Sequence, residues 1–334
     1  MKLKFIDLFA GIGGFRTGLE MAGHECIGFC EADKYAIASY TSMHLITDEQ
    51  RERLSSLSLR QRQKEILKDE YRNGEWFVND IKNVTGTNIP KADCWCFGSP
   101  CQDFSLEGLK NGLQGDRSSL VREVFRILWE IEEEDRPEWL IYENVKGMFS
   151  SNRGFDYLSI LIAMDELGYD VEWQILNSKN FGVPQTRERV FTCGHLRRKG
   201  RRQIFPVEGT NTQNCASVDI IGHKDNFRRN TQVYNPNGIT ETITTSGGGG
   251  RMGHVFIATE SSNAEHYTVW SDKVKSYGMI RKLTPKEYFR LQGWSDDYFN
   301  KAAFVNTDSQ LYKQAGNGVV VPVVKAIGEK INLL

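Results

Sequence analysis

The stretch Lys4-Phe5-Ile6-Asp7-Leu8-Phe9-Ala10-Gly11-Ile12-Gly13-Gly14 stands near the start of the chain and decides the fold class. Its apolar first half predicts a buried strand, and the glycine-rich turn leads into a helical pattern at 15–22. Strand, glycine turn and helix in this order open a doubly wound α/β nucleotide site. Arg16 stands where a dinucleotide-binding turn has its third glycine, and no lysine follows Gly18, so both phosphate-binding interpretations are weakened.

The first 195 residues show alternating strand and helix patterns, which predict a doubly wound, Rossmann-like α/β domain. Strands are predicted at 26–30, 76–78, 93–97, 139–142 and 190–193, a helix at 120–131, and a helix–strand pair at 155–176. Glu31 follows the second strand, where an acidic residue suits hydrogen bonds to ribose hydroxyls. The charged segment 47–73 has apolar residues at helical spacing and predicts one or two helices, without assigned chemistry.

The character of the chain changes after Cys193. Residues 197–280 are basic and rich in Asn, Thr, Ser and Gly, with short strand-like runs at 240–245 and 254–258. They predict a smaller, irregular, mostly β domain. Thr284-Pro285 opens a helix, and an apolar helix at 320–331 is expected to pack back on the first domain. We therefore predict one domain from 1–195 completed by 307–334, and a second domain with its hinge at 196–306.

Composition indicates an ordinary globular protein, since 40% of the residues are hydrophobic and 25% are charged. No signal peptide or membrane span is visible, which predicts a cytoplasmic protein. Seven cysteines lack CxxC pairs and a set of partner histidines, so reduced thiols are expected and a metal site is not. The segment 181–230 contains ten basic and four acidic residues. This excess of positive charge fits a phosphate-binding patch or a solvated face equally well.

A cysteine loop, Gly98-Ser99-Pro100-Cys101-Gln102-Asp103-Phe104-Ser105, follows the apolar run at 94–97. Pro100 fixes its own φ and biases Ser99 toward extended geometry, so a stiffened turn presents the thiol of Cys101. Such a thiol can act as a nucleophile. A small buried hydrophobic side chain is the alternative for a single cysteine.

Five motifs taken in order resemble the motif series of the C5-cytosine methyltransferases, at 7–15, 98–105, 143–145, 182–189 and 314–319. The resemblance covers nearly the whole chain except 47–75 and 197–280. It implies a DNA (cytosine-5)-methyltransferase of bacterial or phage type, with a role in restriction-modification or in protection of phage or host DNA. Double-stranded DNA is the implied substrate, and a cognate restriction endonuclease is a possible partner. No feature of the sequence demands a dimer, so a monomer is expected.

The resemblance also implies a site for S-adenosyl-L-methionine, which leaves as S-adenosyl-L-homocysteine, and no metal. The implied cofactor-binding residues are Phe9, Gly11, Ile12 and Gly14 around the methionine and sugar, Glu31 on the ribose hydroxyls, Asp80 and Ile81 at the adenine, and Pro100, Leu120, Asn317 and Val319 completing the pocket.

The catalytic residues implied by the resemblance are Cys101, Glu143, Arg187 and Arg189. Addition of the Cys101 thiolate to C6 of cytosine turns the ring into an enamine that is nucleophilic at C5. Glu143 would hydrogen-bond N3 and the exocyclic amine, and Arg189, with Arg187 nearby, would hold the base carbonyl. A structural alternative is a carboxylate satisfied by loop amides and an arginine strip paired through Glu188. The cytosine must leave the base stack to reach these groups.

The residues predicted to contact DNA are Gln102 and Ser105 of the cysteine loop and Thr245, Ser246, Gly248 and Arg251 of a glycine-rich loop. The chain departs from the family pattern at Ser99, Ala32, Glu107 and Gly318. Two alternatives stay open: a tRNA cytosine-5 methyltransferase, and a catalytically silent homologue that only binds DNA. A nicotinamide dehydrogenase is disfavoured by the missing third glycine.

Overall fold

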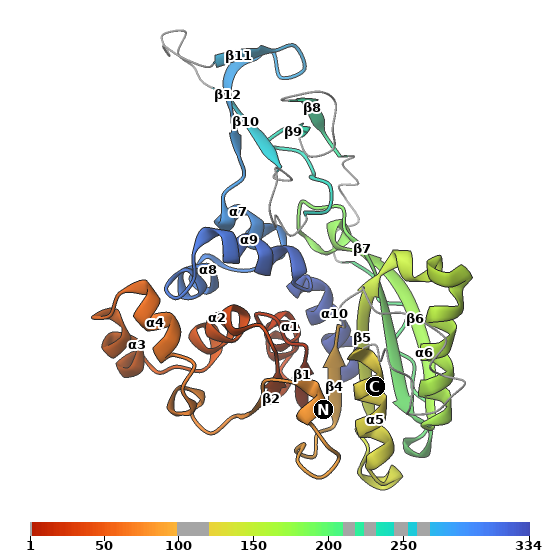
Figure 1. Ribbon diagram of the computed structural model, residues 1–334. Helices are drawn as coiled ribbons and strands as arrows, with labels where there is room; N and C mark the ends of the chain where they lie inside the picture. Colours follow the sequence, from red (N-terminus) through yellow and green to blue (C-terminus); the bar gives the residue numbers. More distant parts are fainter. Residues whose placement is uncertain (1, 99–119, 210–217, 224–231, 244–252, 259–267) are drawn as a thin grey trace.

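The computed structural model describes residues 2–98, 120–209, 218–223, 232–243, 253–258 and 268–334, and two β-sheets organise them (Figure 1). The large sheet has seven strands. They are β1 (Lys4–Leu8), β2 (Glu25–Cys30), β3 (Trp76–Val78), β4 (Cys94–Phe97), β5 (Trp139–Val145), β6 (Tyr169–Asn177) and β7 (Glu188–Leu196).

The strand order of the large sheet is β3-β2-β1-β4-β5-β7-β6. Strand β1 pairs in parallel with β2 on one side and with β4 on the other, so the strand order reverses between β1 and β4. The predicted doubly wound α/β class is thereby confirmed. Ligands of such sheets bind beyond the carboxyl ends of the strands, at the reversal point. Strand β7 runs antiparallel to both β5 and β6, a reversal that the sequence patterns do not predict.

Helices cover both faces of the large sheet. On one face, α5 (Leu120–Glu130) and α6 (Phe155–Glu166) contribute to one hydrophobic cluster. On the other, α1 (Gly14–Met21) and α10 (Val321–Asn332) share a second cluster with the strands. A Cβ on Gly18 of α1 would lie 2.5 Å from Cβ of Val324, so the two helices meet where α1 has no side chain. The predicted packing of the C-terminal helix on the first domain is confirmed.

The segment predicted as one or two helices forms α3 (Asp48–Ser55) and α4 (Leu59–Glu65), next to α2 (Lys34–His44). Leu54 and Ile66 are fully buried, and with Ala38 of α2 they form a separate small cluster. Short 3-10 turns lie at Asp69–Arg72, Ile81–Asn83, Glu133–Asp135, Lys146–Phe149, Ser151–Gly154, Ser178–Phe181 and Arg197–Lys199.

The small sheet has the strand order β11-β12-β10-β9-β8. Its strands are β8 (Ile220–His223), β9 (Gln232–Tyr234), β10 (His254–Ala258), β11 (Thr268–Ser271) and β12 (Ser276–Lys282). The strand predicted at 254–258 is confirmed. The run at 240–245 was expected to form a strand, and this is wrong for its described part: 240–243 contain only an isolated bridge from Thr240 to Gln185.

Helices α7 (Pro285–Leu291), α8 (Asp296–Ala303) and α9 (Asp308–Asn317) lie between the two sheets (Figure 1). Thr284 and Glu287 cap each other's backbone amides at the start of α7, as the Thr-Pro pair predicts. Helix α8 also contacts α2, since the Ser42 hydroxyl of α2 donates to the carbonyl of Lys301 at 2.6 Å. The predicted domain boundaries at 195, 306 and 307 remain predictions.

Candidate active site

The candidate site lies at the edge of the large sheet where β1, β2, β4 and β5 end. In a parallel sheet these carboxyl ends meet at one edge, next to the reversal point between β1 and β4. Phe9 follows β1, Glu31 follows β2 and Gly98 follows β4. Glu143 lies within β5, two residues before the strand ends. The sequence predicts that these residues from four strands lie in one region. In the structure their backbones lie at the same edge of the large sheet.

The glycine turn after β1 has a backbone that L side chains rarely adopt. Phe9, Gly11 and Gly13 have φ angles of 56°, 55° and 85°. A Cβ on Gly11 would have no atom within 4 Å, which leaves open space beside the turn. A Cβ on Gly14 would lie 3.0 Å from the carbonyl oxygen of Val319, so this part of the turn is packed against the segment after α9. The predicted cofactor residues Gly14 and Val319 are therefore neighbours, and Gly11 lies in the same turn as Gly14.

Glu31 is held by two backbone amides at the tip of β2. Its Oε2 accepts a hydrogen bond from the N–H of Gly11 at 2.7 Å, and its Oε1 accepts from the N–H of Asp33 at 2.8 Å. Burial raises the pKa of the Glu31 carboxyl, and these two amides act in the opposite direction. Each oxygen keeps a further lone pair, so the carboxylate can accept hydrogen bonds from ligand hydroxyls in a fixed orientation.

Arg16 stands where a dinucleotide-binding turn has its third glycine. Its side chain points away from the glycine turn and into the protein. Its Nη1 lies 2.6 Å from Oε1 of Glu75, and its Nε lies 3.0 Å from Oε1 of Glu20. Nη1 also donates to the hydroxyl of Tyr40 at 3.2 Å. The basic side chain nearest the turn is therefore engaged within the protein, which favours a ligand without phosphates there.

The remaining predicted cofactor residues are spread around the same edge. Asp80 accepts from the N–H of Lys82 at 3.0 Å and caps the turn that holds the buried Ile81. The other four are Phe9, half-buried after β1, Ile12, buried within the glycine turn, Leu120, half-buried at the start of α5, and Asn317, exposed at the end of α9.

Glu143 and Arg189 form an ion pair across β5 and β7. Nε of Arg189 lies 3.1 Å from Oε1 of Glu143, and the two side chains are 17% and 12% exposed. Glu143 lies opposite Phe191, and Arg189 lies opposite Val145, so the pair is diagonal on one face of the sheet. The sequence predicts that the strand ends before Glu143, but β5 continues to Val145 and fixes the carboxylate by its ladder.

The electrostatic setting of Glu143 combines burial with positive charge. Burial raises the pKa of the Glu143 carboxyl, whereas the charges of Arg189 and Arg187 act in the opposite direction. The cysteine loop starts beside this carboxylate, since a Cβ on Gly98 would lie 3.3 Å from Oε2 of Glu143. The carboxylate of Glu143 therefore lies next to the residue from which the loop departs.

Several predicted site residues lie outside the described part of the chain. They are Pro100, Cys101, Gln102 and Ser105 of the cysteine loop, and Thr245, Ser246, Gly248 and Arg251 of the glycine-rich loop. The catalytic, cofactor-binding and DNA-binding roles predicted for these residues stay predictions.

Arg187 is buried, with 4% of its surface exposed, and the hydrogen bonds of its guanidinium differ from those of Arg189. Nη2 donates to the carbonyls of Gly316 at 3.2 Å and of Gly318 at 3.0 Å. Its neighbour Gln185 has no exposed surface and was not among the predicted site residues. Both side chains lie within the motif at 182–189, but their partners are more than 50 residues away in sequence.

Besides Arg189, two of the ten basic residues between 181 and 230 lie near acidic side chains from outside that range. Arg197 pairs with Asp165 and Asp170, and Arg202 lies 3.4 Å from Glu138. These contacts favour the alternative of a structural role for this part of the excess.

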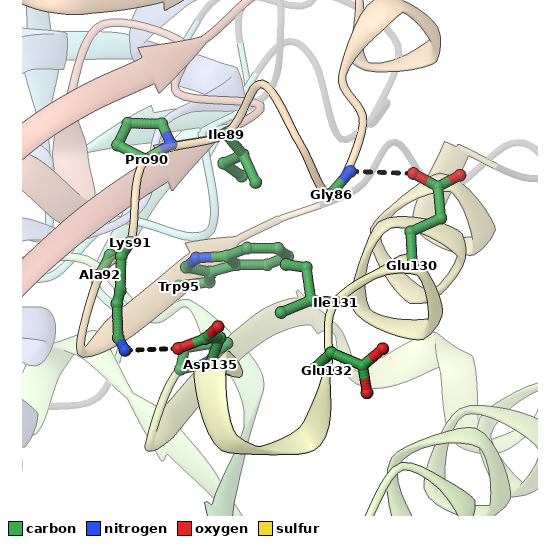
Figure 2. A pocket seen from close by; sticks show the side chains of 11 residues that line it. Gly86, Ile89, Pro90, Lys91, Ala92, Trp95, Glu130, Ile131, Glu132 and Asp135 are labelled. Carbon is green, nitrogen blue, oxygen red and sulfur yellow. Dashed lines mark hydrogen bonds and ion pairs between the residues drawn. The ribbon is translucent and has the colours of Figure 1, made fainter.

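A pocket of about 280 Å³ lies at the opposite end of β4 from the cysteine loop (Figure 2). It is lined by Gly86, Ile89, Pro90, Lys91, Ala92, Trp95, Glu130, Ile131, Glu132, Asp135 and Pro137. Two polar contacts close its sides, an ion pair of Lys91 with Asp135 and a hydrogen bond from the N–H of Gly86 to Glu130. Because the pocket lies at the start of β4, it is separate from the candidate site, which lies at the carboxyl end of that strand.

No cluster of three or more His, Cys, Asp or Glu side chains suited to a metal ion occurs among the described residues. Nor does this part of the chain contain a helix long and apolar enough to cross a membrane.

Comparison with solved structures agrees with the fold. The chain superposes on the S. pombe Dnmt2 methyltransferase with a TM-score of 0.63 at 17% identity, covering 100% of this chain and 98% of that one. The Entamoeba histolytica methyltransferase EhMeth gives a TM-score of 0.64 at 16% identity, with 100% and 99% coverage. At this identity the likeness concerns the fold.

Sequence comparison identifies the family. The pattern of the family described as C-5 cytosine-specific DNA methylase matches residues 3–68 and 57–333. The type II methyltransferase M.HpaII of Haemophilus parainfluenzae is 31% identical over 99% of this chain and 89% of its own length. M2.ScrFI of Lactococcus lactis subsp. cremoris is 30% identical over 98% and 99%. The chain therefore belongs to the C-5 cytosine-specific DNA methylase family and is a DNA cytosine-5 methyltransferase.

Proposed function

We propose that this enzyme methylates C5 of a cytosine flipped out of duplex DNA, with Cys101 as the nucleophile and S-adenosyl-L-methionine as the methyl donor. The buried pair of Glu143 and Arg189 beside Gly98 carries the proposal. This pair offers a proton and a positive charge next to the point where the cysteine loop begins.

The residues at the carboxyl edge of the sheet fit S-adenosyl-L-methionine. Glu31 presents an oriented carboxylate for two ribose hydroxyls, and Gly11 leaves space for the ligand beside the turn. Arg16 is engaged with Glu20 and Glu75, in keeping with a ligand that has no phosphate. Asp80, Ile81 and the other predicted residues would complete the pocket. When bound, the cofactor supplies a methyl group activated by a sulfonium.

Glu143 would act on the Watson–Crick edge of the flipped cytosine. Burial raises its pKa and so makes protonation easier than for an exposed glutamate; once protonated, the carboxyl donates to N3 while the other oxygen accepts from the exocyclic amine. As the Cys101 thiolate adds to C6, negative charge develops on N3 and on the base carbonyl. Glu143 stabilises the charge on N3, and Arg189 stabilises the charge on the base carbonyl, in a site shielded from water. Methyl transfer to C5 leaves S-adenosyl-L-homocysteine; water then takes the C5 proton, and elimination of Cys101 with return of the N3 proton to Glu143 restores the aromatic ring and the thiolate.

Duplex DNA has to be opened at one base, because C6 of a stacked cytosine is out of reach of a side chain. Gln102 and Ser105 of the cysteine loop, with the glycine-rich loop from Thr245 to Arg251, would contact the opened duplex. Such an enzyme would serve in restriction-modification or in DNA protection, as a monomer and beside a cognate endonuclease. The type II names of the relatives support that role.

Transfer of labelled methyl groups from S-adenosyl-L-methionine tests the proposal, with unmethylated duplex DNA and tRNA as separate substrates. We expect label in DNA alone, mapped by single-base sequencing to 5-methylcytosine within one short motif. Cys101→Ala should abolish transfer, whereas Cys193→Ala, which removes a buried thiol of β7, should retain it. Label in tRNA alone, transfer by the Cys101→Ala enzyme, or cofactor binding without transfer would each overturn the proposal.

A further inference from the structure

The segment 184–187 meets a distant part of the chain side by side. The N–H of Thr240 donates to the carbonyl of Pro184 at 2.9 Å, and the N–H of Thr186 donates to the carbonyl of Thr240 at 2.8 Å. The hydroxyl of Thr242 donates to the carbonyl of Thr186 at 2.7 Å. Residues 240–242 therefore follow this segment to Ile243, the last described residue before the glycine-rich loop.

Gln185 connects this junction to α7. Its side chain is fully buried; Nε2 donates to the carbonyl of Leu291 at 2.9 Å, and Oε1 accepts from the N–H of Ile243 at 2.8 Å. Both ends of the amide are used, so Gln185 fixes Ile243 relative to the end of α7.

Arg187 connects the same junction to the segment after α9. Nη1 lies 3.5 Å from the carbonyl oxygen of Ile243, a long contact, and Nη2 reaches the carbonyls of Gly316 and Gly318. The chain continues from Gly318 to Val319, which packs against Gly14 of the glycine turn. A continuous set of contacts thus runs from Ile243 through Arg187 to the predicted cofactor site.

We propose that Gln185 and Arg187 are positioning residues that couple DNA binding beside Ile243 to cofactor binding at the glycine turn. DNA that fixes Ile243 would stabilise the contacts of Arg187 with Gly316 and Gly318, and these contacts hold Val319 against Gly14. Because coupling between two binding sites is reciprocal, bound cofactor strengthens DNA binding by the same factor. This inference rests on the proposed function, and it gives Arg187 a role through the backbone.

Isothermal titration of the full chain with S-adenosyl-L-homocysteine tests the coupling, with and without an amplified, unmethylated duplex of mixed sequence. For the parent enzyme we expect DNA to tighten S-adenosyl-L-homocysteine binding about 5-fold or more. Arg187→Lys keeps the charge but loses the planar fork, so the ratio of the two affinities should fall toward one. Arg197→Lys, the same exchange just beyond the other end of β7, should leave the ratio unchanged.

Thr242→Val gives a second, milder variant that removes only the hydrogen bond to Thr186, and it should also lower the ratio. An unchanged ratio in both variants, or a parent enzyme whose cofactor affinity ignores DNA, would overturn the coupling while leaving the proposed function intact. Equal weakening of cofactor binding with and without DNA would also overturn it, because Arg187 would then only support the pocket. A parent enzyme that binds neither ligand would instead remove the proposed function.

Discussion

Arg189 reaches Glu143 diagonally across two antiparallel strands, with 3.1 Å between its Nε and Oε1 of the carboxylate. One oxygen of Glu143 thereby faces a permanent positive charge, and the other lies toward Gly98. This division assigns different work to the two oxygens. In the proposed mechanism, the oxygen that is engaged by Arg189 leaves the other to carry the proton that is donated to the base.

Glu143→Gln should lower the rate of methyl transfer by about 10²–10⁴-fold, because an amide can donate to N3 but cannot transfer a proton. Single-turnover assays with saturating cofactor and DNA measure the effect. The raised pKa of Glu143 also predicts that the parent rate falls as the pH rises through that pKa, since the protonated form is the active one. Retention of this fall in the Glu143→Gln enzyme would assign it to another group.

Gly98→Ala should reduce kcat about 10-fold, equivalent to about 1.4 kcal/mol of barrier, with little change in cofactor affinity. The added Cβ would lie 3.3 Å from Oε2 of Glu143, so the carboxylate or the start of the cysteine loop has to move. Gly222→Ala is the matched control, because a Cβ there meets no atom within 4 Å. Equal kcat values for both variants would contradict the crowding at Gly98.

Glu31→Gln should weaken S-adenosyl-L-homocysteine binding about 10- to 100-fold, since hydrogen bonds to a charged group contribute about 1.5–3 kcal/mol. Calorimetric titration measures this loss. Glu25→Gln provides the control at the other end of β2, where Glu25 makes an exposed pair with Lys2. A similar affinity for both variants would remove Glu31 from the cofactor site.

Gly18→Ala should destabilise the fold by about 1–3 kcal/mol, because the new Cβ would overlap Val324 of α10. Denaturant unfolding of the two proteins gives the difference in the free energy of unfolding. Val324→Ala in the same chain should recover part of the loss by making room. Additive losses in the double variant would show that the two helices do not compete for that space.

Asp7→Asn should remove a pH dependence of stability. Asp7 lies fully buried in β1, its Oδ1 has no partner among the described residues, and burial raises its pKa well above the usual range. A folded-state pKa above the unfolded value means that the contribution of Asp7 to stability is greatest below about pH 4 and is lost as the pH rises through the folded-state pKa. The variant should therefore gain stability relative to the parent as the pH is raised from 4 to 8, measured by urea unfolding. Asp297→Asn, at an exposed position, is the control.

Local patterns in the sequence predict most of the large sheet and its helices, because an apolar run or a glycine turn determines the conformation of a few consecutive residues. They do not predict that β7 is reversed, since strand direction depends on pairing between distant segments. The position of Arg16 is visible in the sequence, but its partner Glu75 lies 59 residues away. The carbonyls bound by Arg187 are likewise 129 and 131 residues distant, and no periodicity marks them.

Because β7 runs antiparallel to β5, it carries the chain away from the candidate site. Arg189 is the second residue of β7, so the chain leaves this strand seven residues later, about 23 Å away, at the opposite edge of the sheet. It then passes along β6, where Gln174 binds the backbone of Val207, and comes back to meet Gln185 at Thr240. Both ends of this excursion are anchored on the catalytic body. Segments of other lengths could therefore be exchanged between these anchors while Glu143 and Arg189 stay in register on β5 and β7.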